Sequence, residues 1–150
     1  MKDICVATTH IKARNGALLS SLRNKQGKDI LKWLETVKES SPIILTRDLN
    51  AEPSESVYKT VTENKKGPLQ SSYKINVDEE EGLADSLEYA NWKIRETGEQ
   101  KHIFEYIFHS PQLQTVSTLE MATEQQIGEE RLPSLQFATD HLSLVADIKI

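Results

Sequence analysis

Two residues suited to phosphoryl chemistry, Asp48 and Asn50, directly follow the apolar run at 42–45, within the segment TRDLNAEP. In an extended backbone, residues two apart project to the same side, so this carboxylate and this amide form a pair. A carboxylate can hold a magnesium ion or orient a water molecule, and an amide can donate to a phosphate oxygen. An Asx turn before a helix N-cap has the same pattern, so both interpretations stay open.

A histidine and two cations stand at the end of another expected strand. The apolar, β-prone run ICVATT at 4–9 ends on His10, with Lys12 and Arg14 close behind it. A histidine and two cations at the end of a strand are typical of the edge of an active site. A solvated loop explains any one of these residues equally well.

A buried carboxylate is expected at Glu105. The strand at 102–109 is largely apolar on both faces, which is typical of a central strand, and a carboxylate is costly there without a partner. A backbone group or a histidine that must be oriented would serve as that partner. Asp140 and His141, just before the terminal strand, bring such a histidine to another strand end.

These residues need a scaffold of alternating strands and helices. Helical spacing of apolar residues predicts an amphipathic helix at 17–37 whose charged residues face solvent. The other expected elements are strands at 4–9, 42–45 and 69–75, a short helix at 55–62, a hairpin of strands at 89–95 and 102–109, a strand at 113–119, a loop through 133 and a strand at 142–150. The acidic segment at 76–90 is expected to be a mobile insertion.

Composition sets the broad class. The chain has 150 residues, 37% of them hydrophobic, which predicts one globular domain or a part of one. The net charge of -5 argues against non-specific coating of nucleic acid. No run is long enough to span a membrane, and the single Cys5 permits no internal disulfide. We therefore expect an intracellular, cytoplasmic protein, with a mitochondrial location as the alternative.

Several blocks in a fixed order carry a family resemblance. The blocks are THIKAR, QGKDIL, LNAEPSESVY, WKIR, QIGEERLPS and TDHLSLV. Together they resemble the nocturnin-like, deadenylase-related branch of the endonuclease/exonuclease/phosphatase superfamily. The resemblance implies an α/β fold, half of a four-layer α/β sandwich with a mainly antiparallel mixed sheet and flanking helices. Residues 1–150 would form the C-terminal half of one such domain.

The resemblance implies catalytic roles for five residues: His10, Asp48, Asn50, Glu105 and His141. By that resemblance His10 contacts the scissile phosphate, Asp48 activates the attacking water and Asn50 holds the phosphate. Glu105 orients His141, which stabilises the transition state.

The resemblance also implies a cofactor and a substrate. The cofactor is magnesium, near Asp48 and, through water, near Asp140. The substrate is a nucleotide, either NADP(H), from which the 2′-phosphate is removed, or an RNA 3′ end. Lys12, Arg14 and Arg95 stand where the family places cations on the phosphates.

Three departures from the family pattern predict impaired activity. Arg47 replaces a glycine before the catalytic aspartate and is expected to pair with Asp48 and weaken metal binding. Glu105 replaces an aspartate and is one methylene longer. The half of the domain that supplies the direct magnesium ligands, an Asn and a Glu, is expected to be missing. A non-catalytic half-domain that binds nucleotide or RNA phosphates is the alternative function.

An uncovered sheet face predicts a protein partner. The helix at 17–37 can cover only one face of the sheet, and the other would expose a large apolar patch. Two copies could cover each other's faces as a homodimer, or a complementary N-terminal half could do so.

Overall fold

The computed structural model describes residues 3–75 and 86–150, and of Arg95 it describes the backbone alone. The described elements are, in chain order, β1 (Cys5–His10), α1 (Ala17–Val37), β2 (Ile43–Asp48), α2 (Ser56–Thr62), β3 (Gln70–Ser71), β4 (Asn91–Arg95), β5 (Gly98–His102), β6 (Glu105–His109), β7 (Gln114–Thr118), α3 (Glu124–Ile127) and β8 (Ala146–Lys149). Most of the expected mobile insertion at 76–90 lies outside the described residues, so that expectation stays a prediction.

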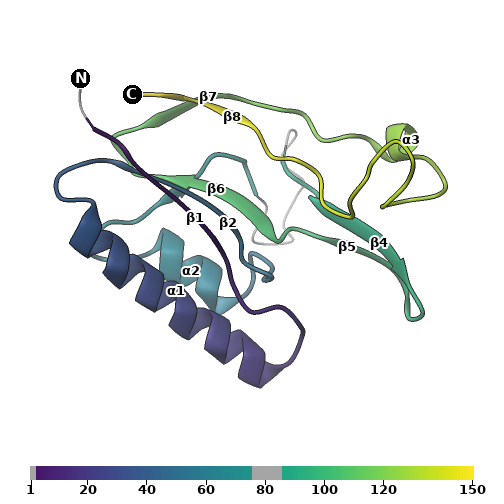
Figure 1. Ribbon diagram of the computed structural model, residues 1–150, viewed down its shortest axis with the longest axis horizontal. Helices are drawn as coiled ribbons and strands as arrows, with labels where there is room; N and C mark the ends of the chain where they lie inside the picture. The colour runs from purple at the N-terminus through teal and green to yellow at the C-terminus, as the bar shows by residue number, and fades with distance from the viewer. Residues whose placement is uncertain (1–2, 76–85) are drawn as a thin grey trace.

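A four-stranded mixed sheet with the order β1-β2-β6-β3 organises the molecule (Figure 1). β1 and β2 are parallel, and the long helix α1 connects them, as parallel pairing requires a crossover. β6 runs antiparallel to both β2 and β3. The expected fold class, a mixed and mainly antiparallel sheet with flanking helices, is therefore confirmed.

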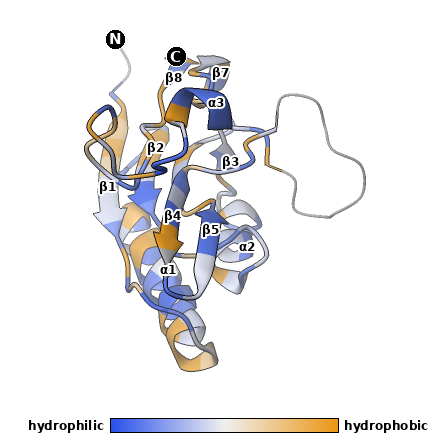
Figure 2. Ribbon diagram, turned by 90° about the vertical axis from the view of Figure 1, so that its right-hand side faces the viewer, coloured by the Kyte–Doolittle hydropathy of each residue, from blue (hydrophilic) through white to orange (hydrophobic). Residues whose placement is uncertain are grey.

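The helices α1 and α2 lie side by side on one face of this sheet (Figures 1 and 2). Leu34 of α1, Leu45 of β2 and Phe108 of β6 meet in the resulting core and are almost completely buried. Gly27 permits the close approach of the two helices, because a Cβ there would lie 2.8 Å from a Val57 methyl carbon. A glycine inside a helix costs about 1 kcal/mol, which this packing offsets.

A two-stranded ribbon, β7–β8, covers part of the opposite face. The Tyr73 hydroxyl lies 3.1 Å from the Leu119 carbonyl and 2.9 Å from the Val145 carbonyl and donates to this pair of acceptors. The Thr115 hydroxyl lies 3.0 Å from Nε2 of His109 in β6. We expected this second face of the sheet to be uncovered, but the β7–β8 ribbon covers part of it. A homodimer or a complementary half remains a prediction.

The expected hairpin has a different second strand. β4 pairs with β5, and the turn at residues 96 and 97 leads into Gly98, whose φ of 113° suits glycine. The expected returning strand at 102–109 is divided at Ile103 and Phe104. Only its second part forms β6, which joins the four-stranded sheet.

Three smaller differences concern element ends. β3 has two residues, because its backbone pairs with β6 only at Gln70 and Ser71. The terminal strand β8 begins at Ala146, not at 142. The expected loop through 133 contains α3, which starts with a capping box between Thr123 and Gln126. No described helix is long and apolar enough to cross a membrane.

Candidate active site

His10, Asp48 and Glu105 occupy one register line across three neighbouring strands. His10 of β1 pairs with Asp48 of β2, and Asp48 pairs with Glu105 of β6. Residues in register have side chains on the same face of a sheet, so this geometry places one imidazole and two carboxylates in a row. His10 Nε2 lies 3.6 Å from Asp48 Oδ2. The line lies at the end of the parallel strands, on the face opposite the helices.

Asn50 joins this row through a tight turn. Its backbone N–H donates to Asp48 Oδ1 at 2.7 Å, which is an Asx turn, and its φ of 45° is one that asparagine tolerates. Its Nδ2 lies 2.8 Å from His10 Nε2 and donates to the Ile11 carbonyl at 3.2 Å. The Asx turn is therefore confirmed, and the use of Asp48 and Asn50 as a carboxylate–amide pair for phosphoryl chemistry stays a prediction.

His141 contacts the row through Glu105. Nδ1 of the imidazole is hydrogen-bonded to Oε1 of the Glu105 carboxylate, which confirms the expected carboxylate–histidine pair. The second oxygen, Oε2, is buried without a hydrogen-bond partner. Burial raises the pKa of Glu105 to about 7; the charge of His141 opposes the rise and Asp48 adds to it.

Asp140 is paired with Lys93 and lies next to His141. Asp140 Oδ2 accepts from Lys93 Nζ at 3.2 Å, and Oδ1 lies 3.6 Å from His141 Nε2. Burial acts to raise the pKa of Asp140, but the hydrogen bond and charge of Lys93 outweigh it, so this pKa lies below the ordinary value. Lys93 was not among the predicted site residues. Lys93 belongs to the motif WKIR, but the sequence does not show that β4 reaches the site. The backbone bridge between Asn91 and His141 brings β4 there.

The expected ion pair of Arg47 with Asp48 is wrong. Arg47 projects to the helix side of the sheet, because adjacent residues of a strand alternate between faces. It is 4% exposed, and none of its side-chain nitrogens has a hydrogen-bond partner among the described residues. Burial lowers the pKa of Arg47 to about 10. Arg47 therefore lowers the stability of the fold, and it does not compete with a metal ion for the Asp48 carboxylate.

Lys12 and Arg14 lie exposed on the loop between β1 and α1. A buried residue of α1, Arg23, holds this loop. Its Nη1 donates to the Arg14 carbonyl at 2.7 Å and to the Lys12 carbonyl at 3.4 Å. Its Nη2 donates to both carboxylate oxygens of Glu55, at 2.9 and 2.7 Å. One guanidinium thus ties the cation-bearing loop to the start of α2.

The solvated interpretation of every charge on α1 is wrong for Arg23, which is 2% exposed. The sequence contains a signal for this burial, since Arg23 falls on the same helical stripe as Gly27, Leu31 and Leu34, the other buried residues of α1. The remaining predicted cation, Arg95, ends β4 with its backbone paired to Gly98. Its side chain is outside what the structure describes.

Asp48, Glu105 and His141 form a candidate site for a metal ion. Each offers one ligand atom, and these atoms lie within 4.8 Å of one another. The unpartnered Glu105 Oε2 and the crowding of two carboxylates fit a divalent cation, which would satisfy that oxygen and reduce the repulsion. Oxygen ligands suit magnesium. Asp140 is not part of this group, so its predicted contact through water stays a prediction.

The sequence is similar to curated proteins over nearly its whole length. It is 39% identical to nocturnin from Drosophila melanogaster over 165 residues, which cover 99% of this chain and 26% of that protein. It is 40% identical to nocturnin from Homo sapiens over 149 residues, which cover 97% of this chain and 33% of that protein. The chain therefore spans about a quarter to a third of these relatives. No family model matches it.

Solved structures share the fold. The human nocturnin catalytic domain with bound sulfate superposes with a TM-score of 0.73 at 32% identity, over 99% of this chain and 47% of that one. A structure of ANGEL2, a 2′,3′-cyclic phosphatase, gives a TM-score of 0.73 at 20% identity, over 97% of this chain and 56% of that one. The arrangement of strands and helices is thus that of the endonuclease/exonuclease/phosphatase fold.

Proposed function

We propose that this chain, a homologue of part of nocturnin with the endonuclease/exonuclease/phosphatase fold, carries the phosphate-handling residues of a magnesium-dependent phosphoesterase. The observation that supports this most is the row of His10, Asp48 and Glu105, to which Asn50 and His141 are joined by direct contacts. Carboxylates, an amide and oriented imidazoles at one strand edge are the groups that hydrolysis of a phosphate ester needs.

Each residue has a role that its contacts allow. The carboxylate of Asp48 orients and deprotonates the attacking water, and the Asn50 amide donates to a phosphate oxygen in place of its contact with His10 Nε2. Glu105 fixes the imidazole of His141 through Nδ1, which leaves Nε2 to donate to the developing phosphorane. Magnesium, when bound at the carboxylates of Asp48 and Glu105, would neutralise negative charge on the phosphate.

The substrate we propose is a nucleotide phosphate, either the 2′-phosphate of NADP(H) or the 3′ end of an RNA. The exposed Lys12 and Arg14, on a loop that Arg23 holds in place, would bind further phosphates. We assign the same role to Arg95. A nocturnin catalytic domain at 32% identity has been solved with sulfate, an anion with the shape and charge of phosphate.

Hydrolysis assays test this function. NADPH and a short oligoadenylate are incubated with the chain, with and without magnesium, and phosphate or mononucleotide release is measured. Because of the departures from the family pattern we expect weak magnesium-dependent release, which Asp48→Asn lowers further by at least about 100-fold, as loss of one transition-state contact does. Asp29→Asn, an exposed aspartate of α1 paired only with Lys25, is the matched control. Release that is absent, or equal in both variants, contradicts the proposal.

A second candidate function is phosphate binding without chemistry. It is favoured by the loop of Lys12 and Arg14, whose backbone carbonyls are held by the buried Arg23. Titration calorimetry with NADPH separates the two functions. Binding that Lys12→Ala and Arg14→Ala abolish, in a chain that releases no product, would support this second candidate.

A further inference from the structure

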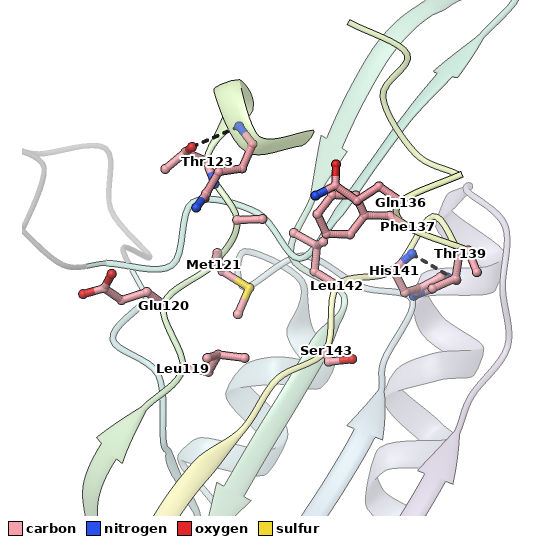
Figure 3. Close-up of a pocket in the computed structure, with 13 residues that line it drawn as sticks. Leu119, Glu120, Met121, Thr123, Gln136, Phe137, Thr139, His141, Leu142 and Ser143 are labelled. Carbon is pink, nitrogen blue, oxygen red and sulfur yellow. Dashed lines mark hydrogen bonds between the residues drawn. The ribbon is translucent and has the colours of Figure 1, made fainter. Parts of the chain in front are cut away.

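A cavity of about 690 Å³ opens beside His141 (Figure 3). Its walls come from two segments, 119–126 after β7 and 136–143 before β8. His141 belongs both to this wall and to the catalytic row, in which its Nδ1 bonds Glu105. A ligand in the cavity would therefore adjoin any phosphate held at the row. Cavities of a few hundred to 1,000 Å³ accommodate small ligands.

The lining of the cavity selects an uncharged, flat group. Met121, Phe137 and Leu142 contribute apolar surface, and all three belong to the hydrophobic cluster around Trp92. Among the described residues that line the cavity, none is a lysine or an arginine, and Glu120 is an acid. Phosphates would be repelled or left unpaired there. An aromatic ring can stack on Phe137 and pack against the thioether.

Two glutamine side chains supply polar recognition at the rim. Gln126 uses its Oε1 to accept from the Thr123 N–H at 2.8 Å, which leaves its NH₂ group for a ligand. Gln136 is exposed and offers both an NH₂ donor and a carbonyl acceptor. A carboxamide matches the N6 donor and N7 acceptor of adenine, the pairing that glutamine makes with this base.

We propose that this cavity binds the adenine base of the substrate, while the catalytic row holds the phosphate. The inference rests on the proposed function and adds to that function the part of the nucleotide that is recognised. NADP(H) and an oligoadenylate both carry adenine, so the cavity serves either source. Phe137 stacks on the base, Gln136 and Gln126 bond its edge, and His141 marks the boundary between base and phosphate.

Binding of nucleosides tests the cavity without any catalysis. Adenosine and uridine, which carry no phosphate, are titrated into the full chain and followed by ligand-observed NMR. We expect adenosine to bind at least about tenfold more tightly than uridine. Gln136→Ala and Gln126→Glu should each weaken adenosine binding at least about fivefold. The Glu substitution preserves the capping box, so α3 stays folded.

Gln125→Ala is the matched control, since Gln125 is exposed on the same helix but does not line the cavity. This variant should bind adenosine as the parent chain does. Equal binding of the two nucleosides, no detectable adenosine binding, or unchanged affinity in the Gln136 and Gln126 variants would overturn the proposal.

A kinetic comparison separates failure of the cavity from failure of the function. NADPH and oligoadenylate carry a base, whereas p-nitrophenyl phosphate does not. We expect Gln136→Ala to raise KM for at least one adenine substrate by a larger factor than KM for the aryl ester, and the affected substrate identifies the source. Equal loss on all three esters contradicts base recognition. If no ester is hydrolysed while adenosine binding still depends on Gln136, the cavity assignment stands and the phosphoesterase assignment fails.

Discussion

Two arginines are buried in the part of the chain that the structure describes, Arg23 and Arg47; they make opposite contributions to stability, and the same substitution at each tests this. Arg47 has no hydrogen-bond partner for its guanidinium, whereas Arg23 donates to Glu55 and to two backbone carbonyls. Both are at most 4% exposed. We predict that Arg47→Met stabilises the fold and that Arg23→Met destabilises it.

The size of the Arg47 effect follows from its pKa. Burial lowers this pKa from 12.5 to about 10, which corresponds to about 3 kcal/mol against the charged form at neutral pH. Because the folded pKa is the lower one, the cost is complete below pH 10 and is relieved only as the pH rises from 10 towards 12.5. Methionine fills similar space without charge, so we expect a gain of about 2–3 kcal/mol, or about 4–12 °C in Tm.

For Arg23→Met the expected loss is about 3 kcal/mol, because the half-buried Glu55 and two carbonyls lose their partner. Urea unfolding followed by circular dichroism at pH 7 measures both changes. Arg47→Gly should be less stable than Arg47→Met, since glycine leaves a cavity and loosens the strand. A destabilised Arg47→Met variant would refute the reasoning, because it would mean that Arg47 has an anionic partner in solution.

Three further predictions concern the site and the helix packing. In the metal-free protein, the pKa of Glu105 is raised to about 7, so its ionisation should lower stability by up to about 3 kcal/mol as the pH rises from 4.5 through 7. Glu105→Gln should remove this dependence of stability on pH, measured by urea unfolding between pH 5 and 8. An unchanged dependence would place its origin in another group. Gly27→Ala should lower the free energy of unfolding by about 1 kcal/mol net. Its Cβ would lie 2.8 Å from a methyl carbon of the fully buried Val57, and this overlap outweighs the gain in helix propensity. A variant that is more stable in thermal melts would show that the two helices separate without cost. Magnesium at 100 times its Kd should raise the unfolding free energy by about 2.7 kcal/mol, and Asp48→Asn should reduce this gain; equal gains would argue against a metal site at this carboxylate.

Local patterns were sufficient for much of the fold. The helix predicted at 17–37 matches α1 at both ends, and β1 is shifted by one residue from the expected strand. β2 begins one residue after its expected start and runs three residues past its expected end. These elements have strong internal signals, namely helical spacing of leucines and short β-branched runs. The hairpin was harder, because 98–102 contains no apolar run and forms a strand only through pairing with β4.

Side-chain partners required long-range information. The alternation of a strand already implies that Arg47 and Asp48 face opposite sides, and our expectation of an ion pair overlooked it. That helices bury the Arg47 side without supplying an anion is a property of the packing. The role of Arg23 likewise depends on Glu55, which is 32 residues away and reaches it only when α1 and α2 lie side by side.

For the candidate site, the sequence by itself indicated the Asx turn of Asp48 and Asn50, because the side chain of an aspartate can accept from the backbone N–H two residues later. It also indicated that Glu105 needs a partner, because a carboxylate in an apolar strand is costly. Only the tertiary structure decided that Glu105 aligns with Asp48, that His141 is its partner and that Lys93 restrains Asp140. The physical reason is register, since a shift of one residue between β2 and β6 would turn Glu105 away from the row and leave no catalytic edge.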